Sequence, residues 1–262
     1  MPWGKSSTIS SLLIPQGRNA ARAEGCSGAI EVAYPSFFIL IFHISNHTKM
    51  EFISEELDQY VCLHTENEPA VLSDLNRRTH VEVLQPRMLS GHYQGRVLSL
   101  FSHMMQPKRI LEIGTYTGYS ALALAEGLIP DGKLYTIDVN EEREELVQEY
   151  IEKSGMTDKV IAMIGDAAQI IPTLDEEFDI VFIDADKRNY PLYYDLVFDK
   201  VRKGGLIISD NVLWSGKVLE DYNKLDKSTQ ILMDFNKRVK EDPRVQPVLL
   251  PIRDGLMIAR KL

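Results

Sequence analysis

Residues 109–127 read RILEIGTYTGYSALALAEG, in which an apolar strand pattern passes through a turn with two glycines into a helical pattern. This alternation recurs along the chain. We expect strands at 109–113, 133–138, 160–164, 178–184 and 206–210. We expect helices at 120–127, 141–154, 167–174, 191–201 and 227–240. Repeated strand–helix units with near-continuous apolar strands predict an α/β fold, in which a Rossmann-like, mostly parallel sheet is covered by helices on both faces.

The regions on either side of these units have different patterns. Three helical stretches are expected between residues 51 and 106, and Pro107 ends the last one, at 91–105. The apolar side of that helix is expected to carry Val97, Leu98, Phe101, Met104 and Met105. Near the C-terminus, β-rich runs at 245–250 and 256–260 flank a turn at 251–255, which predicts an antiparallel hairpin.

The first 49 residues differ in character from the rest. They are rich in Ser, Gly and Ala, and no helical or strand period persists through them. A helix-like pattern begins just after Met50, which favours Met50 as the natural start. We therefore expect an atypical N-terminal extension at 1–49, mobile or upstream of the start, and one domain at 50–262. A specific targeting arm at 1–49 is the competing interpretation.

Composition indicates a soluble globular protein. The chain has 262 residues, of which 44% are hydrophobic and 26% charged, as is usual for a protein with a packed core. Its formal net charge of −9 provides no overall attraction for a polyanion. Only Cys26 and Cys62 are present, and no apolar run approaches the ~20 residues that span a bilayer. We therefore expect a cytoplasmic protein without a membrane partner.

The ends of the first three strands indicate which cofactor the sheet binds. Gly114 and Gly118 do not have the G-x-G-x-x-G spacing that brings a backbone close to a pyrophosphate. Asp138 ends the second strand, where a carboxylate can accept both hydroxyl protons of a ribose. Asp166 follows the third strand and is expected to cap the next helix or to bind an adenine amino group. Singly, these residues also fit as turn and capping residues; in this order they favour S-adenosylmethionine.

Oxygen-bearing side chains end the fourth and fifth strands. Asp184 follows one strand, and Asp210 and Asn211 follow the other. If the strands are neighbours, their ends lie ~4.8 Å apart, which brings the three side chains within reach of one point. Three oxygen ligands without Cys or His predict a hard divalent cation, Mg²⁺ or else Mn²⁺ or Ca²⁺.

A cation at this point suggests the reaction. A hydroxyl attacks the methyl group of a sulfonium well only as an oxyanion, and a bound cation lowers the pKa of the hydroxyl. Lys187 lies close to the same cation, which should depress its proton affinity, so Lys187 is the predicted general base. The alternative is that Asp184 and Asp186 are turn residues and that Lys187 is a solvated surface charge.

Four stretches of the chain stand in a specific order. They are EIGTYTGYS at 112–120, FIDADKRNY at 182–190, DNVLWSG at 210–216 and DGLMIAR at 254–260. Together they resemble the cation-dependent O-methyltransferases, which include plant caffeoyl-coenzyme A O-methyltransferase and, more distantly, catechol O-methyltransferase. The resemblance covers about 88–262. It implies a class I methyltransferase fold, an S-adenosylmethionine-dependent O-methyltransferase domain within 50–262, and a homodimer.

The resemblance also implies the roles of individual residues. Metal ligands fall on Asp184, Asp210 and Asn211, and the base falls on Lys187. The implied cofactor contacts are Ser90, Glu112, Gly114, Ser120, Asp138, Ala167 and Asp186. Asp184 is counted with the cofactor set as well as with the metal ligands, and it would also face the bound substrate. Asp166 joins the cofactor set because of its place after the third strand.

The methyl acceptor is less well defined, because the chain departs from the plant enzymes at Arg188, Ser215 and the loop 217–227. We expect a small catechol-like or hydroxylated aromatic acceptor. Tyr190 and Trp214 are expected either to form an aromatic wall over its ring or to pack in the core. The alternative acceptor is a hydroxylated uridine at the wobble position of a tRNA anticodon. For tRNA, phosphate contacts would come from Arg77, Arg78, Arg87 and Arg96, which otherwise form a solvated face.

Two other classes of function fit the sequence less well. A nicotinamide-dependent dehydrogenase is disfavoured by the glycine spacing and by the lack of a coherent hydride site. A non-catalytic S-adenosylmethionine-binding module would keep Asp138. It would have no need for Asp184, Asp210, Asn211 and Lys187 together.

Overall fold

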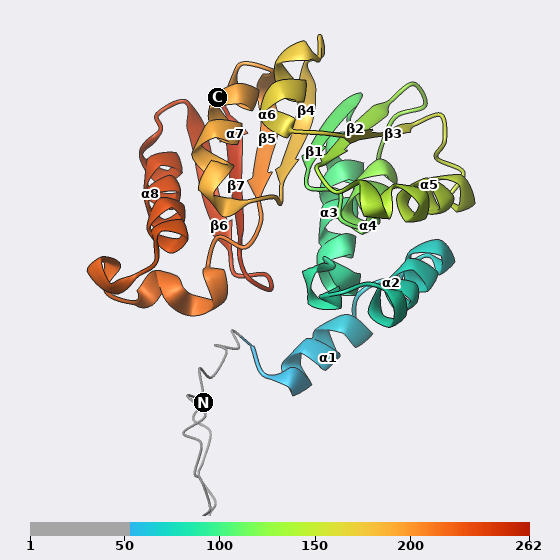
Figure 1. Ribbon diagram of the computed structural model, residues 1–262, viewed down its shortest axis with the longest axis horizontal. Coiled ribbons are helices and arrows are strands. Elements are labelled where there is room, and N and C mark those ends of the chain that lie inside the picture. Colours follow the sequence, from blue (N-terminus) through green and yellow to red (C-terminus); the bar gives the residue numbers. More distant parts are fainter. Residues whose placement is uncertain (1–52) are drawn as a thin grey trace, which may run out of the picture. The chain divides into compact units, whose positions relative to one another are not determined.

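The computed structural model describes residues 53–262 and gathers seven strands from that part of the chain into one sheet (Figure 1). The strands are β1 Arg109–Ile113, β2 Lys133–Asp138, β3 Val160–Ile164, β4 Phe178–Ile183, β5 Val201–Ser209, β6 Val245–Leu250 and β7 Leu256–Lys261. Their order is β3-β2-β1-β4-β5-β7-β6. The strands from β3 to β5 are parallel, whereas β7 is antiparallel to β5 and β6. The α/β class, the mostly parallel sheet and the C-terminal hairpin are confirmed.

Eight α-helices surround this sheet in the described residues. They are α1 Glu55–Leu63, α2 Ala70–Glu82, α3 Gly91–Met105, α4 Tyr119–Ala125, α5 Glu144–Lys153, α6 Ala167–Ile170, α7 Tyr190–Phe198 and α8 Lys227–Glu241. Six short 3-10 helices add η1 Pro86–Met88, η2 Glu141–Arg143, η3 Ile171–Thr173, η4 Lys187–Asn189, η5 Trp214–Leu219 and η6 Tyr222–Lys224. The predicted extension at 1–49 and the boundary at Met50 lie outside the described residues.

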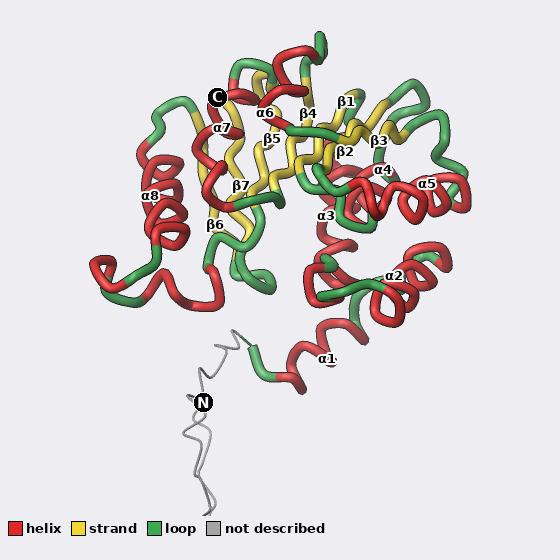
Figure 2. The backbone as a smooth tube through the Cα atoms, viewed as in Figure 1, coloured by secondary structure: helices red, strands yellow, loops and turns green. Residues whose placement is uncertain are grey.

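Helices flank the sheet strands in the backbone trace (Figure 2). Alternating strand side chains divide the core into two clusters, one on each face of the sheet. In β1, Leu111 and Ile113 pack with α6, α7 and α8, whereas Ile110 packs with α2, α3, α4 and α5. Strands buried on both faces need apolar residues at nearly every position, which is why the bounds expected for β1 to β4 agree with the structure to within one residue, whereas β5 begins five residues before the expected start at 206. Helices on both faces are therefore confirmed.

Several predicted boundaries are wrong for local reasons. Helix α7 ends at Phe198, because Val201 already pairs with Phe178 and begins β5. Gly204 has a φ of +80°, which is unusual within a strand, yet β5 continues through it. Pro172 ends α6 early, because proline cannot donate the next helical hydrogen bond, and the chain continues as η3.

The predicted apolar face of α3 is only partly correct. Leu98 is fully buried, but 72% of Met104 is exposed. Met104 therefore lies off the face that packs on the sheet.

The winding of the sheet places a binding crevice beside β1 and β4. These two strands are neighbours, and the chain continues to β2 and β3 on one side and to β5 on the other. Ligands of open α/β sheets bind at the carboxyl ends of the strands at such a switch point. All the predicted strand-end residues lie along this edge.

None of the helices in the described part of the chain combines the length and the apolar character needed to cross a membrane.

Candidate active site

The turn between β1 and α4 brings the cofactor side of the crevice against the end of β4. Gly114 has a φ of +103°, and its N–H donates to the carbonyl of Ile137 at 2.8 Å. A Cβ atom at Gly114 would lie 2.0 Å from the carbonyl oxygen of Asp184. Only glycine allows this close approach, so the turn can pass directly over the strand that carries Asp184.

The Asp138 carboxylate is held in place by backbone amides. Its Oδ2 accepts from the N–H of Tyr116 at 2.8 Å, and its Oδ1 accepts from the N–H of Asn140 at 2.9 Å. These bonds fix the carboxylate at the C-terminal end of β2, where the argument from sequence expects the ribose. A carboxylate has about four acceptor positions, so hydroxyl donors can still be accommodated.

A small pocket opens beside Asp138. Its polar lining includes Thr115, Asn140 and Arg143, and its apolar lining includes Val147 and Met163. The Arg143 guanidinium lies over the ring of Tyr116, 4.7 Å from its centroid. Apolar side chains next to an anchored carboxylate suit a base attached to a ribose. Sequence reasoning missed these lining residues, because none has a distinctive motif of its own.

Glu112 is a fully buried carboxyl with spare hydrogen-bonding capacity. Thr136 donates to its Oε2 at 2.5 Å. Among the described residues its Oε1 finds no partner, although it is buried. Burial raises the pKa of Glu112 to about 8. A buried acceptor without a partner is costly, so this oxygen fits a contact with a donor group of the cofactor.

Three further residues expected to contact the cofactor are buried: Ser90, Ser120 and Ala167. Their exposed fractions are 6%, 7% and 4%. Their contacts with the cofactor stay a prediction. Asp166 and Asp186 act as helix caps: Asp166 accepts from Ala168 N–H at 2.9 Å, and Asp186 accepts at the start of η4. Both carboxylates therefore cap helices. Direct contacts of these two carboxylates with the cofactor stay a prediction.

Lys187 lies at the centre of the acceptor side of the crevice. Its Nζ donates to Asp184 Oδ1 at 3.2 Å, to Asn211 Oδ1 at 2.9 Å and to the hydroxyl of Tyr190 at 2.5 Å. The side chain is buried, with 7% of the residue exposed. The interpretation of Lys187 as a solvated surface charge does not hold. An ammonium group has three donors, and all three are used here.

Asp210 is held from the opposite direction by a residue that sequence reasoning did not identify. Gln94 Nε2, on α3, donates to Asp210 Oδ2 at 2.6 Å, and the N–H of Asn211 donates to Oδ1 at 2.6 Å. Burial and then the charge of Asp184 raise the pKa of Asp210 to about 7. Gln94 stands one helical turn after Ser90, and this i, i+4 spacing is the only signal that links it to the site.

The donor set fits a hard divalent cation. Among the described residues, no three His, Cys, Asp or Glu side chains gather around one point. A cation site here would therefore consist of the carboxylates of Asp184 and Asp210 and the amide oxygen of Asn211. The Lys187 ammonium bridges two of these three side chains. Asp210 is buried and Asp184 is partly buried, and carboxylate oxygens are the ligands that Mg²⁺, Mn²⁺ and Ca²⁺ prefer.

The loop after β5 contains backbone conformations that are uncommon outside glycine. Asn211, Trp214 and Ser215 have φ values of 55°, 49° and 53°. Asn236 Nδ2, on α8, donates to the carbonyl of Val212 at 2.8 Å and helps to hold this loop. Such conformations cost about 1–3 kcal/mol each and persist where surrounding contacts impose them, often at functional sites.

The two aromatic residues proposed for the acceptor wall lie in different surroundings. Tyr190 is fully buried, and its hydroxyl lies 3.1 Å from the carbonyl of Ile183 and 3.0 Å from that of Asp210. It therefore packs beneath Lys187 instead of facing an acceptor. Trp214 is partly exposed, with its ring centroid 6.0 Å from Lys187 Nζ. Only Trp214 is available as part of a wall.

The arginines considered for phosphate contacts are largely engaged in ion pairs. Arg77 lies 3.4 Å from Asp74, and Arg78 bridges Glu82 and Glu149. Arg96 is buried and forms two hydrogen bonds with Glu126, of 2.9 and 2.6 Å. These three charges are balanced within the fold, whereas Arg87 forms no ion pair in the described part of the chain.

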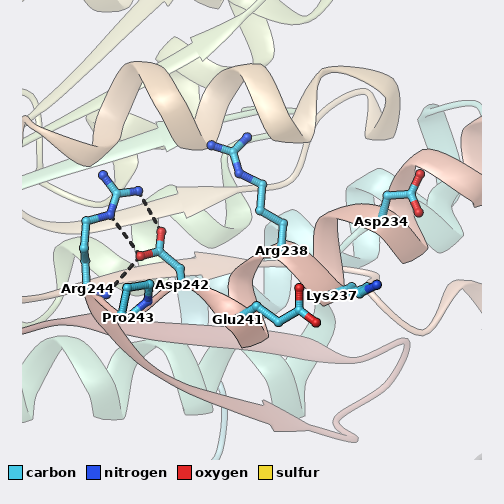
Figure 3. Close-up of a pocket in the computed structure, with 7 residues that line it drawn as sticks. All are labelled: Asp234, Lys237, Arg238, Glu241, Asp242, Pro243 and Arg244. Atoms are coloured by element: carbon cyan, nitrogen blue, oxygen red, sulfur yellow. Dashed lines mark hydrogen bonds and ion pairs between the residues drawn. The ribbon is translucent and has the colours of Figure 1, made fainter.

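A second depression lies away from the crevice, at the C-terminal end of α8 (Figure 3). Its two arginines are paired, Arg244 with Asp242 at 2.7 Å and Arg238 with Asp195 at 3.0 Å. It contains none of the predicted site residues, so the crevice is the better candidate.

Comparison with known proteins points to one family. A model of the O-methyltransferase family matches residues 63–262. A caffeoyl-CoA O-methyltransferase from Eucalyptus gunnii is 34% identical over 221 residues, which cover 80% of this chain and 88% of that protein. Tricin synthase 2 from Oryza sativa subsp. japonica is 34% identical over 260 residues, which cover 93% of this chain and 87% of that protein.

Solved structures agree with these relatives. An O-methyltransferase from Bacillus cereus in complex with SAH superposes with a TM-score of 0.72 at 30% identity, covering 79% of this chain and 97% of that one. The O-methyltransferase TomG from Streptomyces achromogenes, in complex with SAM, superposes with a TM-score of 0.73 at 30% identity, covering 79% and 96%. Both carry the methyl donor or its product.

Proposed function

Since the chain belongs to the O-methyltransferase family and is an S-adenosylmethionine-dependent enzyme, we propose that it methylates a hydroxyl of a small catechol-like or hydroxylated aromatic acceptor with the help of a divalent cation. The observation that carries this proposal is the position of Lys187. Its Nζ contacts Asp184 and Asn211 at the ends of neighbouring strands, within the same crevice as the cofactor pocket.

The cofactor side of the crevice matches the parts of S-adenosylmethionine. Asp138 would accept the ribose hydroxyls, and the partly apolar pocket beside it would take the adenine. The buried carboxyl of Glu112 has an oxygen to offer to a donor such as the amino group of the methionine end. Gly114 lets the donor and acceptor sides meet, because it places the β1–α4 turn against Asp184.

Asp184, Asp210 and Asn211 would hold the divalent cation, as the donor set allows. A cation bound there would supply positive charge that makes an acceptor hydroxyl more acidic and would help to orient it. Asp210 is kept in place by Gln94 and by the Asn211 N–H, so its carboxylate is oriented before any ligand binds.

Lys187 is placed to accept the proton of the acceptor hydroxyl. In the transfer, the acceptor oxygen forms a bond to the methyl carbon, the sulfur–methyl bond breaks, and the sulfur keeps that electron pair as S-adenosylhomocysteine forms. The proton leaves the oxygen and passes to Lys187 Nζ. To accept this proton, the Lys187 amine must be in its neutral form.

A small acceptor agrees better with the site than tRNA does. The relatives reported above are named for caffeoyl-CoA and tricin, which are small phenolic compounds. Trp214 provides a partly exposed aromatic surface near Lys187. Arg77, Arg78 and Arg96 are ion-paired within the fold and have little free charge for phosphates.

A methyl-transfer assay with labelled donor tests the proposal. The enzyme is given Mg²⁺ and, in separate reactions, caffeic acid, caffeoyl-CoA, or tRNA from a strain that lacks the gene. We expect label in the small phenols and none in tRNA. Label found only in the tRNA would overturn the acceptor class, while leaving the reaction type intact.

A further inference from the structure

The turn between β6 and β7 contacts the segment that leads into α3. The Arg253 guanidinium donates through Nη1 to the carbonyls of Leu89, at 2.6 Å, and Ser90. Its Nη2 lies 3.4 Å from the carbonyl of Arg87. These residues are 163 to 166 positions apart in sequence. Arg253 therefore fixes the backbone of the segment that carries Ser90.

The same turn contacts the loop after β5. The N–H groups of Val212 and Leu213 donate to the carbonyls of Gly255, at 3.2 Å, and Asp254, at 2.8 Å. The Asp254 carboxylate accepts from the N–H of Ser215 at 2.5 Å. The loop that begins with Asn211 and carries Trp214 is thus attached to the turn at three points.

The conformation of the turn shows that these contacts are imposed on it. Gly255 N–H closes the turn on the carbonyl of Ile252 at 2.8 Å, and Arg253 has a φ of 50° within it. Glycine would adopt this conformation without strain. An arginine at position 253 is explained by the hydrogen bonds that its guanidinium donates to Leu89 and Ser90. Gly255 has a φ of +90°, and a Cβ atom there would lie 2.5 Å from Cγ of Leu213. The loop that carries Leu213 can therefore pack this closely only if residue 255 is a glycine.

We propose that the hairpin turn (residues 251–255) is a positioning element that couples the cofactor segment to the acceptor loop. When a ligand fixes Ser90, Arg253 transmits that order through the turn to residues 212–215. This inference rests on the proposed assignment of Ser90 to the cofactor. It gives a role to the DGLMIAR stretch at 254–260, which neither the metal nor the cofactor contacts account for.

A purely structural hairpin is the competing explanation, and the chain offers a matched control. Arg260 lies on β7 of the same hairpin, and its Nε donates to Gln246 across the β6–β7 pair at 3.1 Å. Within the described residues its side chain forms no hydrogen bond with either site segment, but its loss removes a hairpin contact. Arg260→Ala therefore measures what weakening the hairpin alone does.

The test measures SAH binding by calorimetry and amide hydrogen exchange of residues 212–215, with and without SAH. It needs neither an acceptor nor a metal. In the wild type, SAH should slow exchange at Val212, Leu213 and Ser215. In Arg253→Ala, the Kd for SAH should rise about tenfold, the factor that corresponds to one charge-assisted hydrogen bond, and the slowing at 212–215 should disappear. Arg260→Ala should behave like the wild type in both measurements.

Arg253→Gly separates positioning from folding. Glycine relieves the strain at φ 50° but removes the guanidinium, so the melting temperature should stay near that of the wild type while SAH affinity falls as in Arg253→Ala. Unchanged SAH affinity in both Arg253 variants, or SAH-dependent slowing that persists in them, would overturn the inference. Because no methyl acceptor is used, failure of the acceptor assignment would leave this result standing.

Discussion

The two sides of the crevice are prepared for their ligands in different ways. On the side of β1, β2 and β3, the Asp138 carboxylate is oriented by uncharged backbone N–H groups. On the side of β4 and β5, Asp184 and Asn211 are bridged by the Lys187 ammonium, and Asp210 is buried beside them. On the first side, neutral backbone groups hold the Asp138 carboxylate. On the second side, the positive charge of Lys187 lies against Asp184 and Asn211.

This difference indicates that cofactor binding and methyl transfer depend on different sides of the crevice. We expect the cofactor side to bind S-adenosylmethionine without a metal, because backbone N–H groups already orient the Asp138 carboxylate. Under the proposed function, the acceptor side would need a divalent cation held by Asp184, Asp210 and Asn211, which would supply the positive charge that acidifies the acceptor hydroxyl. Variants on the acceptor side should therefore affect the rate of transfer, and variants on the cofactor side should affect donor affinity.

The largest effect is expected for Asp210→Ala. Losing one of three protein ligands removes both charge and geometry from an oxygen site, so methyl transfer should fall to background. The Kd for SAH should stay within about twofold, since that factor corresponds to well under 1 kcal/mol. Asp210→Asn keeps an oxygen and should be intermediate. Loss of SAH binding in Asp210→Ala would show that the two sides are not separate.

Lys187→Ala should lower kcat by ~10²–10⁴-fold, which is the usual share of general-base catalysis. Bound metal, measured by elemental analysis, should be retained, because Lys187 is not a ligand. Raising the pH should restore part of the rate, since solvent then deprotonates the acceptor. Lys203→Ala, an exposed lysine on β5, is the control. A rate equal to the wild type would remove Lys187 from the mechanism.

Asp138→Ala should act on the other side of the comparison. It removes a pair of charge-assisted hydrogen bonds to the ribose, so S-adenosylmethionine binding should weaken by ~2–4 kcal/mol, as measured by calorimetry. Metal affinity should not change. Asp175→Ala, which removes an exposed carboxylate away from the pocket, should leave binding as it is. An unchanged donor affinity in Asp138→Ala would place the ribose elsewhere.

Gln94→Ala should give the smallest change of the four. Gln94 orients Asp210 from α3 without touching the metal, and losing such a partner typically costs 10–100-fold in metal affinity. The Mg²⁺ concentration for half-maximal activity should rise by roughly that factor, with kcat recovered at saturating metal. Gln94→Glu should be worse, because it places a second carboxylate beside Asp210. If neither variant shifts the Mg²⁺ dependence, the Gln94 bond is only structural.

The same comparison explains what the sequence could predict. The strand ends were predictable because parallel strands buried on both faces are continuous apolar runs, and the polar residue after each run marks its end. This located Asp138, Asp184 and Asp210 without any knowledge of the fold. The expectation that Asp184, Asp210 and Asn211 lie at the ends of neighbouring strands is confirmed, since β4 pairs with β5, whereas their role as metal ligands stays a prediction.

Residues that act from other elements could not be predicted. Gln94 contacts a side chain 116 positions away, and a single glutamine in a helix carries no signal of such a partner. Tyr190 was considered for the acceptor wall, yet it is fully buried beneath Lys187. The role of Arg253 depends on a turn conformation with positive φ, which a non-glycine residue does not reveal from sequence.

The most direct test of the account is to measure methyl transfer and SAH binding on the same metal-free enzyme. The protein is stripped with a chelator, its metal content is checked by elemental analysis, and caffeic acid is supplied with labelled donor. We predict no transfer, an unchanged Kd for SAH, and recovery of transfer on adding Mg²⁺ or Mn²⁺. Full transfer by the metal-free enzyme would contradict the account and return Asp184 and Asp210 to structural roles.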